Sequence, residues 1–258
     1  MWGLEDIKNY RKILAQMVKN DDYTLRGENG ACFIKDDLVI KVYEYPIIKE
    51  KKCDLSKYTS NNIAFPKYYI KSRRKYYGEV MPYFPYKQFY WALDDNISIS
   101  RLLMHYFEMV EEIKKFSNIH MDDLEFHGNI LYDKEKGFYL IDTTKWQDEE
   151  WSCTEKFNIK RFNCALLEAL KAYLYEEDYF DDNDFYVSLM KMYHNILNTK
   201  YGYEFKKIME EYLLCQCDFS SFIIDYAKLI KNCYQQDVET VQDVKNHVKE
   251  LKKQLIFR

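Results

Sequence analysis

The sequence predicts an α+β protein in which a β-rich segment precedes a mainly helical one. Residues 24–43 and 65–81 contain short runs rich in β-branched and aromatic residues, separated by turns with glycine or acidic side chains. All four prolines lie before residue 86, and after residue 155 the only glycine is Gly202. A stretch with so few helix-breaking residues is expected to be helical.

The first β-region contains a glycine turn and a lysine. Residues 24–34 and 38–43 are expected to form strands around short turns, with Gly27 and Gly30 in the first turn and Lys41 inside the last strand. A lone pair of glycines is most often an ordinary turn, and a lysine in an apolar strand is often only a strand end. Their meaning therefore depends on the motifs farther along the chain.

After the lysine strand the sequence predicts one helix and two strands. Proline is tolerated in a first helical turn, so Pro46 is expected to open a helix with residues 47–55 as its body. Residues 65–70 and 77–81 are expected to form two strands joined by the basic turn Lys71–Lys75.

The helical region begins near residue 97. Residues 97–116 and 158–175 carry apolar side chains at spacings near three and four, which is typical of amphipathic and buried helices. Further helices are expected at residues 185–198, 203–214, 219–233 and 237–255.

Between the first two of these helices lies the stretch HMDDLEFHGNILYDKEKGFYLID, which begins at His120. Its β-type runs at 130–132 and 138–141 are joined by a polar turn, which predicts a hairpin. Asn129 and Asp142 stand at the two ends of this hairpin and are expected to lie close together. Their oxygens suit Mg²⁺, which takes one or two protein ligands and leaves the rest to water and phosphates.

In this stretch the chain resembles the protein-kinase-like superfamily, which includes the aminoglycoside and choline phosphotransferases. The resemblance rests on an H-x-D-L-x-x-x-N-type catalytic loop, a strand that ends in a metal-binding Asp, and the preceding glycine turn and strand lysine, in the family's order. The family places the Asn five positions after the catalytic Asp, whereas Asn129 follows Asp123 by six. Either the loop has one extra residue, with Asp123 or Asp122 as the base, or the base is missing.

The resemblance implies a bilobal protein-kinase-like fold. A small β-rich N-lobe with an N-terminal helix would span residues 1–84, and a mainly helical C-lobe would span residues 85–258. It also implies ATP and Mg²⁺ as cofactors. The turn at Gly27 and Gly30 would approach the phosphates, Lys41 would pair with them, and Asn129 and Asp142 would bind Mg²⁺.

Two further assignments come from the resemblance. The family pairs the strand lysine with a glutamate on the next helix, and Glu50 is the expected partner, with Asp54 one turn later on the same face as the alternative. Residues 81–84 would form the hinge that holds adenine against apolar side chains, which assigns Met81 and Tyr83 to nucleotide binding.

The segment after Asp142 departs from regulated protein kinases. Thr143 and Thr144 stand where Phe-Gly is usual, and no phosphosite or A-P-E anchor precedes the helix at Asn158. Three interpretations remain: a phosphotransferase acting on a protein or small-molecule hydroxyl, a pseudokinase serving as a nucleotide-binding or protein-interaction module, and a helical scaffold without a nucleotide site. The order of the motifs disfavours the scaffold.

Composition restricts the partners. The formal charge of −4, with Lys and Arg scattered apart from a small cluster at Lys71–Lys75, argues against a nucleic-acid partner. No signal peptide and no apolar run of membrane-spanning length is visible, so a cytoplasmic protein without a membrane partner is expected. The seven cysteines lack paired metal-ligand spacing and are expected to be reduced.

Overall fold

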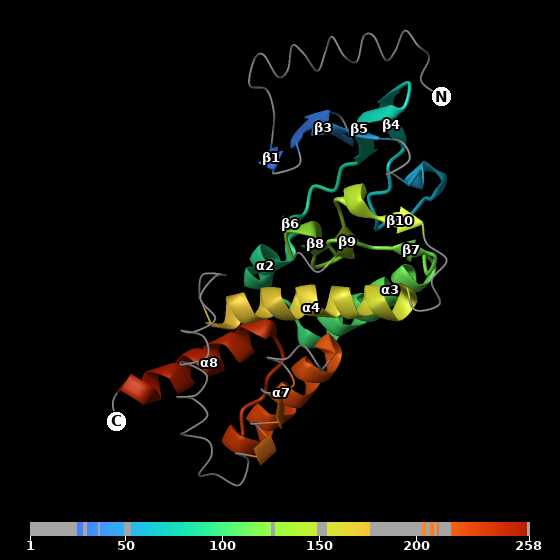
Figure 1. The fold of residues 1–258 in the computed structure, drawn as a ribbon. Helices are drawn as coiled ribbons and strands as arrows, with labels where there is room; N and C mark the ends of the chain where they lie inside the picture. The colour runs from blue at the N-terminus through green and yellow to red at the C-terminus, as the bar shows by residue number, and fades with distance from the viewer. Residues whose placement is uncertain are drawn as a thin grey trace. The chain divides into compact units, whose positions relative to one another are not determined.

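The computed structural model describes residues 25–27, 30–35, 37–48, 53–124, 127–148, 154–175, 203–204, 207–208, 211 and 218–256. An antiparallel sheet comes first and helices follow (Figure 1), which confirms the α+β class with a small β-rich part before a mainly helical one. The expected N-terminal helix, the helix at 185–198 and most of the helix at 203–214 lie outside the described residues.

The chain divides into two compact units, each built from separate segments. The first contains Met1–Pro85, Asn118–Asp122 and Tyr139–Glu150, and the second contains Tyr86–Ser117, Asp123–Phe138 and Trp151–Arg258. Among the described helices of both units, none combines the length and the apolar character needed to cross a bilayer.

A five-stranded antiparallel sheet forms the body of the first unit. Its strands are β1 (Leu25–Gly27), β2 (Gly30–Lys35), β3 (Leu38–Ile48), β4 (Tyr68–Ser72) and β5 (Lys75–Pro82), in the spatial order β1-β2-β3-β5-β4. Alternate side chains of a strand share one face of a sheet. On this sheet the buried apolar cluster consists of Phe33, Ile40, Ile70 and Val80.

The expected helix opened by Pro46 is wrong, because β3 continues through that proline to Ile48. The register of β3 against β5 shifts between Val42 and Ile47, and Pro46 lies exposed within this irregular stretch. Proline has no N–H to donate to a neighbouring strand, so it is tolerated where the ladder is interrupted. Farther along, the described part of this segment contains a short 3-10 helix, η2 (Leu55–Lys57).

The segment that contains Asp142 is joined to the first unit by backbone pairing. Strand β7 (Ile119–His120) pairs with β10 (Gln147–Asp148), and the short helix η5 (Thr143–Lys145) precedes β10. The Leu140 carbonyl accepts from the N–H of Ala64 at 2.9 Å, and the Leu140 N–H donates to the Asn62 carbonyl at 2.8 Å. These bonds fix the chain directly before Asp142.

The second unit combines a small sheet with helices. Its sheet has the order β6-β8-β9. The strands are β6 (Lys87–Gln88), β8 (Ile130–Asp133) and β9 (Gly137–Leu140), and the last two residues of β9 belong to the first unit. The helical segments are α2 (Phe89–Ala92), η3 (Leu93–Asp95), α3 (Ile99–Lys114), η4 (His127–Asn129), α4 (Thr154–Tyr175), α7 (Phe219–Tyr234) and α8 (Val241–Ile256). The predictions at 97–116, 158–175, 219–233 and 237–255 are thereby confirmed to within a few residues at each end.

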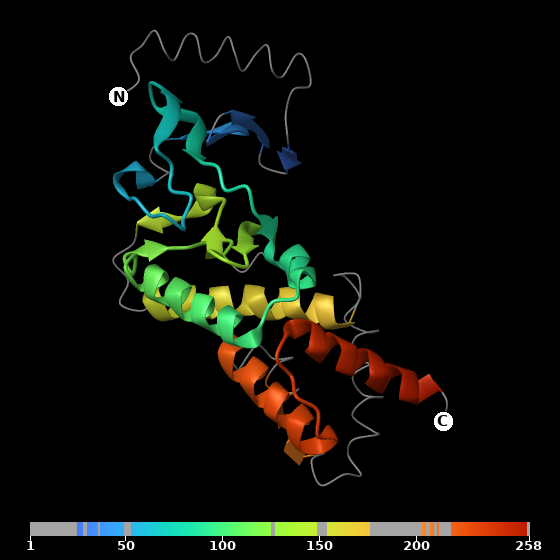
Figure 2. The same ribbon diagram turned by 180° about the vertical axis from the view of Figure 1, so that it is seen from behind.

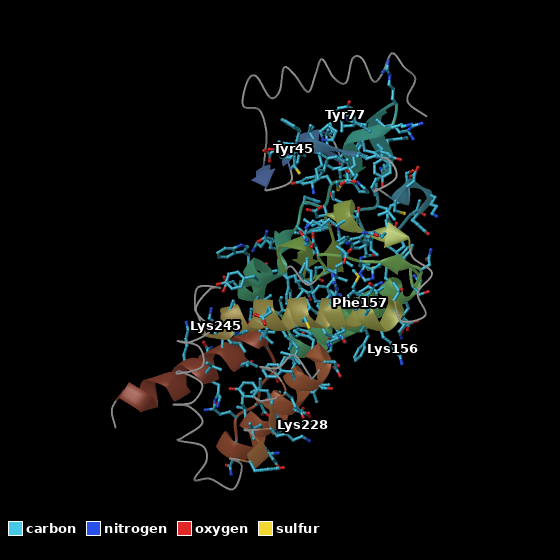
Figure 3. All side chains as sticks on the ribbon, viewed as in Figure 1. Tyr45, Tyr77, Lys156, Phe157, Lys228 and Lys245 are labelled. Carbon is cyan, nitrogen blue, oxygen red and sulfur yellow. The ribbon has the colours of Figure 1, made fainter. Side chains whose placement is uncertain are left out.

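Aromatic side chains fill the core of the second unit, where α3 and α4 run alongside each other (Figure 2). Ring centroids lie 4.7 Å apart between Tyr132 and Phe138 and 5.5 Å apart between Phe138 and Phe162, with the latter pair edge-on. Such aromatic pairs stabilise the fold by more than the burial of their apolar area alone. At the margin, the Lys245 ammonium of α8, labelled in Figure 3, lies 3.8 Å from the Tyr173 ring centroid on α4.

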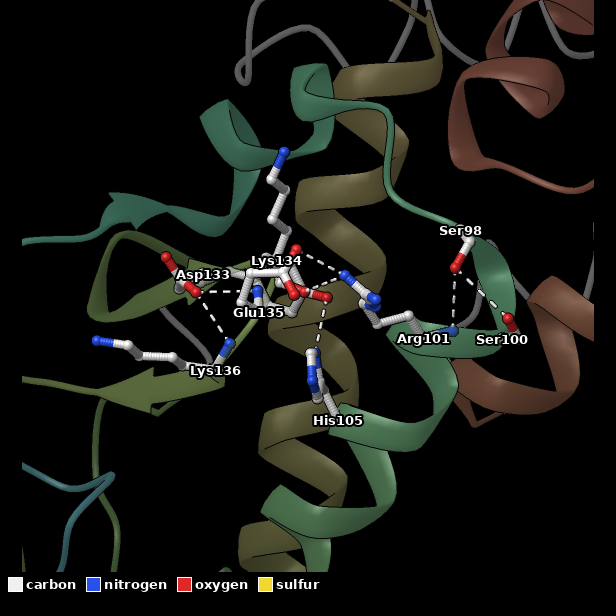
Figure 4. A network of polar contacts seen from close by, with 9 residues as sticks. Ser98, Ser100, Arg101, His105, Asp133, Lys134, Glu135 and Lys136 are labelled. Carbon is white, nitrogen blue, oxygen red and sulfur yellow. Dashed lines mark hydrogen bonds and ion pairs between the residues drawn. The ribbon is translucent and has the colours of Figure 1, made fainter.

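Helix α3 holds the β8–β9 hairpin through polar contacts (Figure 4). Arg101 donates to the Glu135 carboxylate at 2.7 Å, and Nδ1 of the buried His105 lies 3.0 Å from the Tyr132 hydroxyl. Within the turn, Asp133 Oδ1 accepts two backbone N–H bonds, from Glu135 and from the following residue, both at 2.9 Å. The predicted hairpin therefore forms, and its turn is fixed at both the backbone and the side chains.

Candidate functional site

Lys41 on β3 is a buried cation held by a carboxylate far away in the sequence. Its side chain is 7% exposed, and Nζ lies 2.5 Å from Asp142 Oδ1 across a separation of 101 residues. Nζ also donates to the Thr144 hydroxyl at 2.8 Å. Removing a charge from water is unfavourable unless it is paired and hydrogen-bonded. The fold therefore brings together the strand lysine and the aspartate that the sequence selects.

Asp142 occupies a left-handed backbone conformation, with φ 57° and ψ 63°, and caps η5. Aspartate tolerates this conformation better than most residues. Burial alone would raise the pKa of its carboxyl group, but the Lys41 ammonium and the hydrogen bonds from Lys41 and Thr144 hold the pKa below its ordinary value. The carboxylate is thus ionised at neutral pH, and the side chain is 34% exposed. An accessible anionic oxygen of this kind fits one ligand of Mg²⁺.

Glu79 on β5 is a third charged member of this cluster, and the sequence motifs did not select it. It is completely buried and stands directly opposite Lys41 in the β3–β5 register. Its Oε1 accepts from the Thr144 hydroxyl at 2.6 Å. Together with burial, the Glu79 charge raises the pKa of the Tyr43 hydroxyl. The available signal was a glutamate within the apolar run of residues 77–81.

The glycine turn connects β1 to β2, where Gly27 pairs with Gly30. Gly30 has φ 145°, and a Cβ there would lie 1.9 Å from the Val42 carbonyl oxygen, so only glycine fits. The close approach of β3 explains why glycine occupies position 30. A contact of this turn with phosphate stays a prediction. Next to it, Cys32 pairs with Lys41, and burial raises the pKa of its thiol despite the lysine charge.

The two hinge residues lie at the end of β5 and directly after it. Met81 is buried and pairs with Val39, and Tyr83 is half-buried. The Tyr83 N–H donates to the Asp37 carbonyl at 2.9 Å. A nucleotide at this segment would therefore use other backbone groups than that N–H. The assignment of Met81 and Tyr83 to adenine binding stays a prediction.

The acidic pair is divided between the two units, and the asparagine belongs to the second unit. In the first unit, Asp122 Oδ1 lies 3.0 Å from His120 Nε2. In the second unit, Asp123 has φ 62°, and the Asn129 side-chain amide donates to the Asp123 carbonyl at 3.1 Å. This bond spans the loop that is one residue longer than the family pattern. It uses the amide nitrogen of Asn129, and the amide oxygen is the atom that would ligate a metal.

The predicted glutamate partner of Lys41, Glu50, lies outside the described residues. The alternative, Asp54, caps η2, where its carboxylate accepts from the Ser56 N–H at 3.1 Å. Within the described residues, the acidic side chains gathered around Lys41 are therefore Asp142 and Glu79.

No family model matches the chain, and no curated protein sequence matches it. Among the solved structures that match is the crystal structure of Rad53 1–466 in complex with AMP-PNP. The sequences are 13% identical, the TM-score is 0.45, and the match covers 88% of this chain and 63% of that chain.

Proposed function

We propose that this protein is an ATP- and Mg²⁺-dependent kinase-like phosphotransferase that acts on a hydroxyl group of a protein or a small molecule. The observation that carries the proposal is the contact of the buried Lys41 with the partly exposed Asp142, two residues that the family motif selects. A coincidental ion pair would not be expected to join these two positions. The cytoplasmic location expected from the sequence is part of the same proposal.

Each residue has a distinct role in this proposal. The Lys41 ammonium neutralises charge on the nucleotide phosphates, and the ionised Asp142, with the Asn129 amide oxygen as the second predicted ligand, holds Mg²⁺. When bound, the metal ion neutralises the charge that develops on the transferred phosphoryl group. Gly27 and Gly30 allow the backbone to approach the phosphates, and Met81 and Tyr83 border the adenine.

The catalytic base is one of the two neighbouring aspartates. It accepts the proton of the acceptor hydroxyl while the hydroxyl oxygen forms its bond to phosphorus and the bond to the ADP oxygen breaks. We assign this role to Asp123, because its separation of six residues from Asn129 is nearer than that of Asp122 to the five of the family pattern. Asp122, which lies 3.0 Å from His120 Nε2, is the alternative.

A catalytically impaired pseudokinase is the second candidate. It is favoured by the extra residue between Asp123 and Asn129, which would displace the base from the acceptor. Such a protein would bind nucleotide, or a protein partner, without transferring phosphate.

Transfer of labelled phosphate from ATP and Mg²⁺ to components of a cell extract distinguishes the two candidates. We expect Asp123→Asn to abolish transfer while nucleotide affinity is unchanged, because a base that touches only the acceptor contributes little to ATP binding. Asp122→Asn should have the milder effect, and the reverse order would make Asp122 the base. Binding of ATP without transfer to any acceptor or to water would establish the pseudokinase.

A further inference from the structure

Strand pairing places Glu79 beside Lys41 on one face of the sheet. The two residues are direct partners in the antiparallel ladder of β3 and β5. Directly opposed side chains in such a ladder have Cβ atoms about 4.5–5.5 Å apart. Lys41 and Glu79 are therefore neighbours because of backbone register alone, whatever the Asp142 side chain does.

Thr144 links the two charges through one hydroxyl group. The ammonium can only donate, and the carboxylate can only accept. The hydroxyl therefore accepts from Lys41 Nζ at 2.8 Å and gives its single proton to Glu79 Oε1 at 2.6 Å. Both bonds are buried, so the direction of each is fixed by chemistry and water does not compete with them.

Burial separates the roles of the two carboxylates. Glu79 is completely buried, whereas the Asp142 side chain is 34% exposed. A buried carboxylate requires a nearby cation, and Lys41 is the cation opposite it. The partly exposed carboxylate of Asp142 is the one that can exchange Lys41 for a metal ion.

We infer that Glu79, acting through the Thr144 hydroxyl, is the residue that positions the Lys41 ammonium. This inference rests on the proposed function, in which Asp142 turns to Mg²⁺ while Lys41 binds phosphate. Glu79 would then be the acidic partner of Lys41, the role that the family resemblance assigned to Glu50. It would act from a strand, whereas Glu50 was expected on a helix. Glu79 and Thr144 are positioning residues, since neither is assigned a contact with the nucleotide.

The test compares ATP affinity in four variants by calorimetry without metal. Thr144→Val removes both hydrogen bonds with little change in volume, and Glu79→Gln removes the charge. We expect each to weaken ATP binding about tenfold, which is what the loss of roughly 1.4 kcal/mol means. Thr144→Ser retains the hydroxyl and should bind within about twofold of the parent. Glu44→Gln, a change at an exposed glutamate of β3, is the matched control and should bind like the parent.

A second readout reports how firmly Lys41 is held without nucleotide. The rate of Lys41 acylation by an amine-reactive reagent at one fixed pH, read by mass spectrometry in the Asp142→Asn background, should rise in Glu79→Gln and in Thr144→Val, because the amine is no longer held by its hydrogen bonds. Unchanged Lys41 reactivity in both, or Thr144→Ser as impaired as Thr144→Val, would overturn the inference. If the parent fails to bind ATP while the rise in reactivity is present, the proposed function fails and the Glu79–Lys41 coupling stands. Circular dichroism shows whether each variant folds. If Glu79→Gln does not fold, the comparison of Thr144→Val with Thr144→Ser tests the inference.

Discussion

Lys41 is the cation beside two carboxylates, those of Asp142 and Glu79, and only Asp142 could be recognised from the sequence. Lys41 and Asp142 were identified because they belong to a motif with a defined order. Glu79 was missed because the pairing of one strand with another has to be known before its neighbours can be named. The register of β3 against β5 joins residues far apart in the sequence, and periodicity does not encode it.

Replacing Lys41 by methionine should destabilise the protein even without ligand. The change leaves the buried Glu79 and the partly buried Asp142 without their cation, and we expect a loss of about 2–4 kcal/mol in the free energy of unfolding. Lys87→Met, which breaks the exposed ion pair with Asp95, should change it by less than about 1 kcal/mol. Urea unfolding of both variants measures the difference. Equal losses would show that burial does not distinguish the two pairs.

At the scale of elements, the long helices were predictable and the middle of the N-terminal region was not. In α3 the buried residues Leu102, Tyr106, Val110 and Ile113 repeat at the helical period, so pattern and structure agree. Pro46 was misread because proline is compatible with both a first helical turn and an interrupted strand. Only the pairing of β3 with β5 decides between them.

The β8–β9 turn depends on Gly137. Its φ is 92°, and a Cβ there would lie 3.2 Å from Cγ of His105. Gly137→Ala should therefore lower the free energy of unfolding by about 1–3 kcal/mol, through backbone strain and the clash with α3. Lys134→Ala, at an exposed position of the same turn, should stay within about 0.5 kcal/mol of the parent. Chemical unfolding of the pair tests this, and a neutral Gly137→Ala would contradict the described turn.

The contact of α3 with the hairpin should also make stability depend on pH. Burial lowers the pKa of His105, against the opposing charges of Glu108 and Asp133. The folded protein then binds fewer protons than the unfolded chain, so this contribution is complete above the ordinary histidine pKa of about 6.5 and is lost as the pH falls below it. Burial lowers the pKa of His247 in the same direction.

Unfolding free energies measured between pH 7.5 and pH 5 should therefore decrease toward acid. His105→Phe should make this decrease shallower, by at most about 1.4 kcal/mol per pH unit, since one titrating group is removed. A His105→Phe protein with the pH dependence of the parent would show that His105 does not titrate differently in the two states.

At the scale of the whole molecule, the order of elements was predictable from the sequence, whereas the membership of the two units was not. Residues 118–122 and 139–150 belong to the unit of the five-stranded sheet. The pairing of β7 with β10 ties these two segments to each other, and the bonds of Leu140 to the backbone of Asn62 and Ala64 tie them to the N-terminal part of the unit. Such long-range backbone bonds leave no local pattern in a single sequence. They nevertheless place Asp142 in the same unit as Lys41.

The most direct test of the Lys41–Asp142 site is thermal unfolding with ATP, in the presence and absence of Mg²⁺. At a hundred times its dissociation constant a ligand stabilises by about 2.7 kcal/mol, which raises the melting temperature of a chain of this size by roughly 5–10 °C. We expect Asp142→Asn to lose most of the Mg²⁺-dependent part of this shift and Lys41→Ala to lose stabilisation with or without the metal ion. An unchanged melting temperature of the parent at millimolar ATP and Mg²⁺, or both variants responding like the parent, would contradict the site.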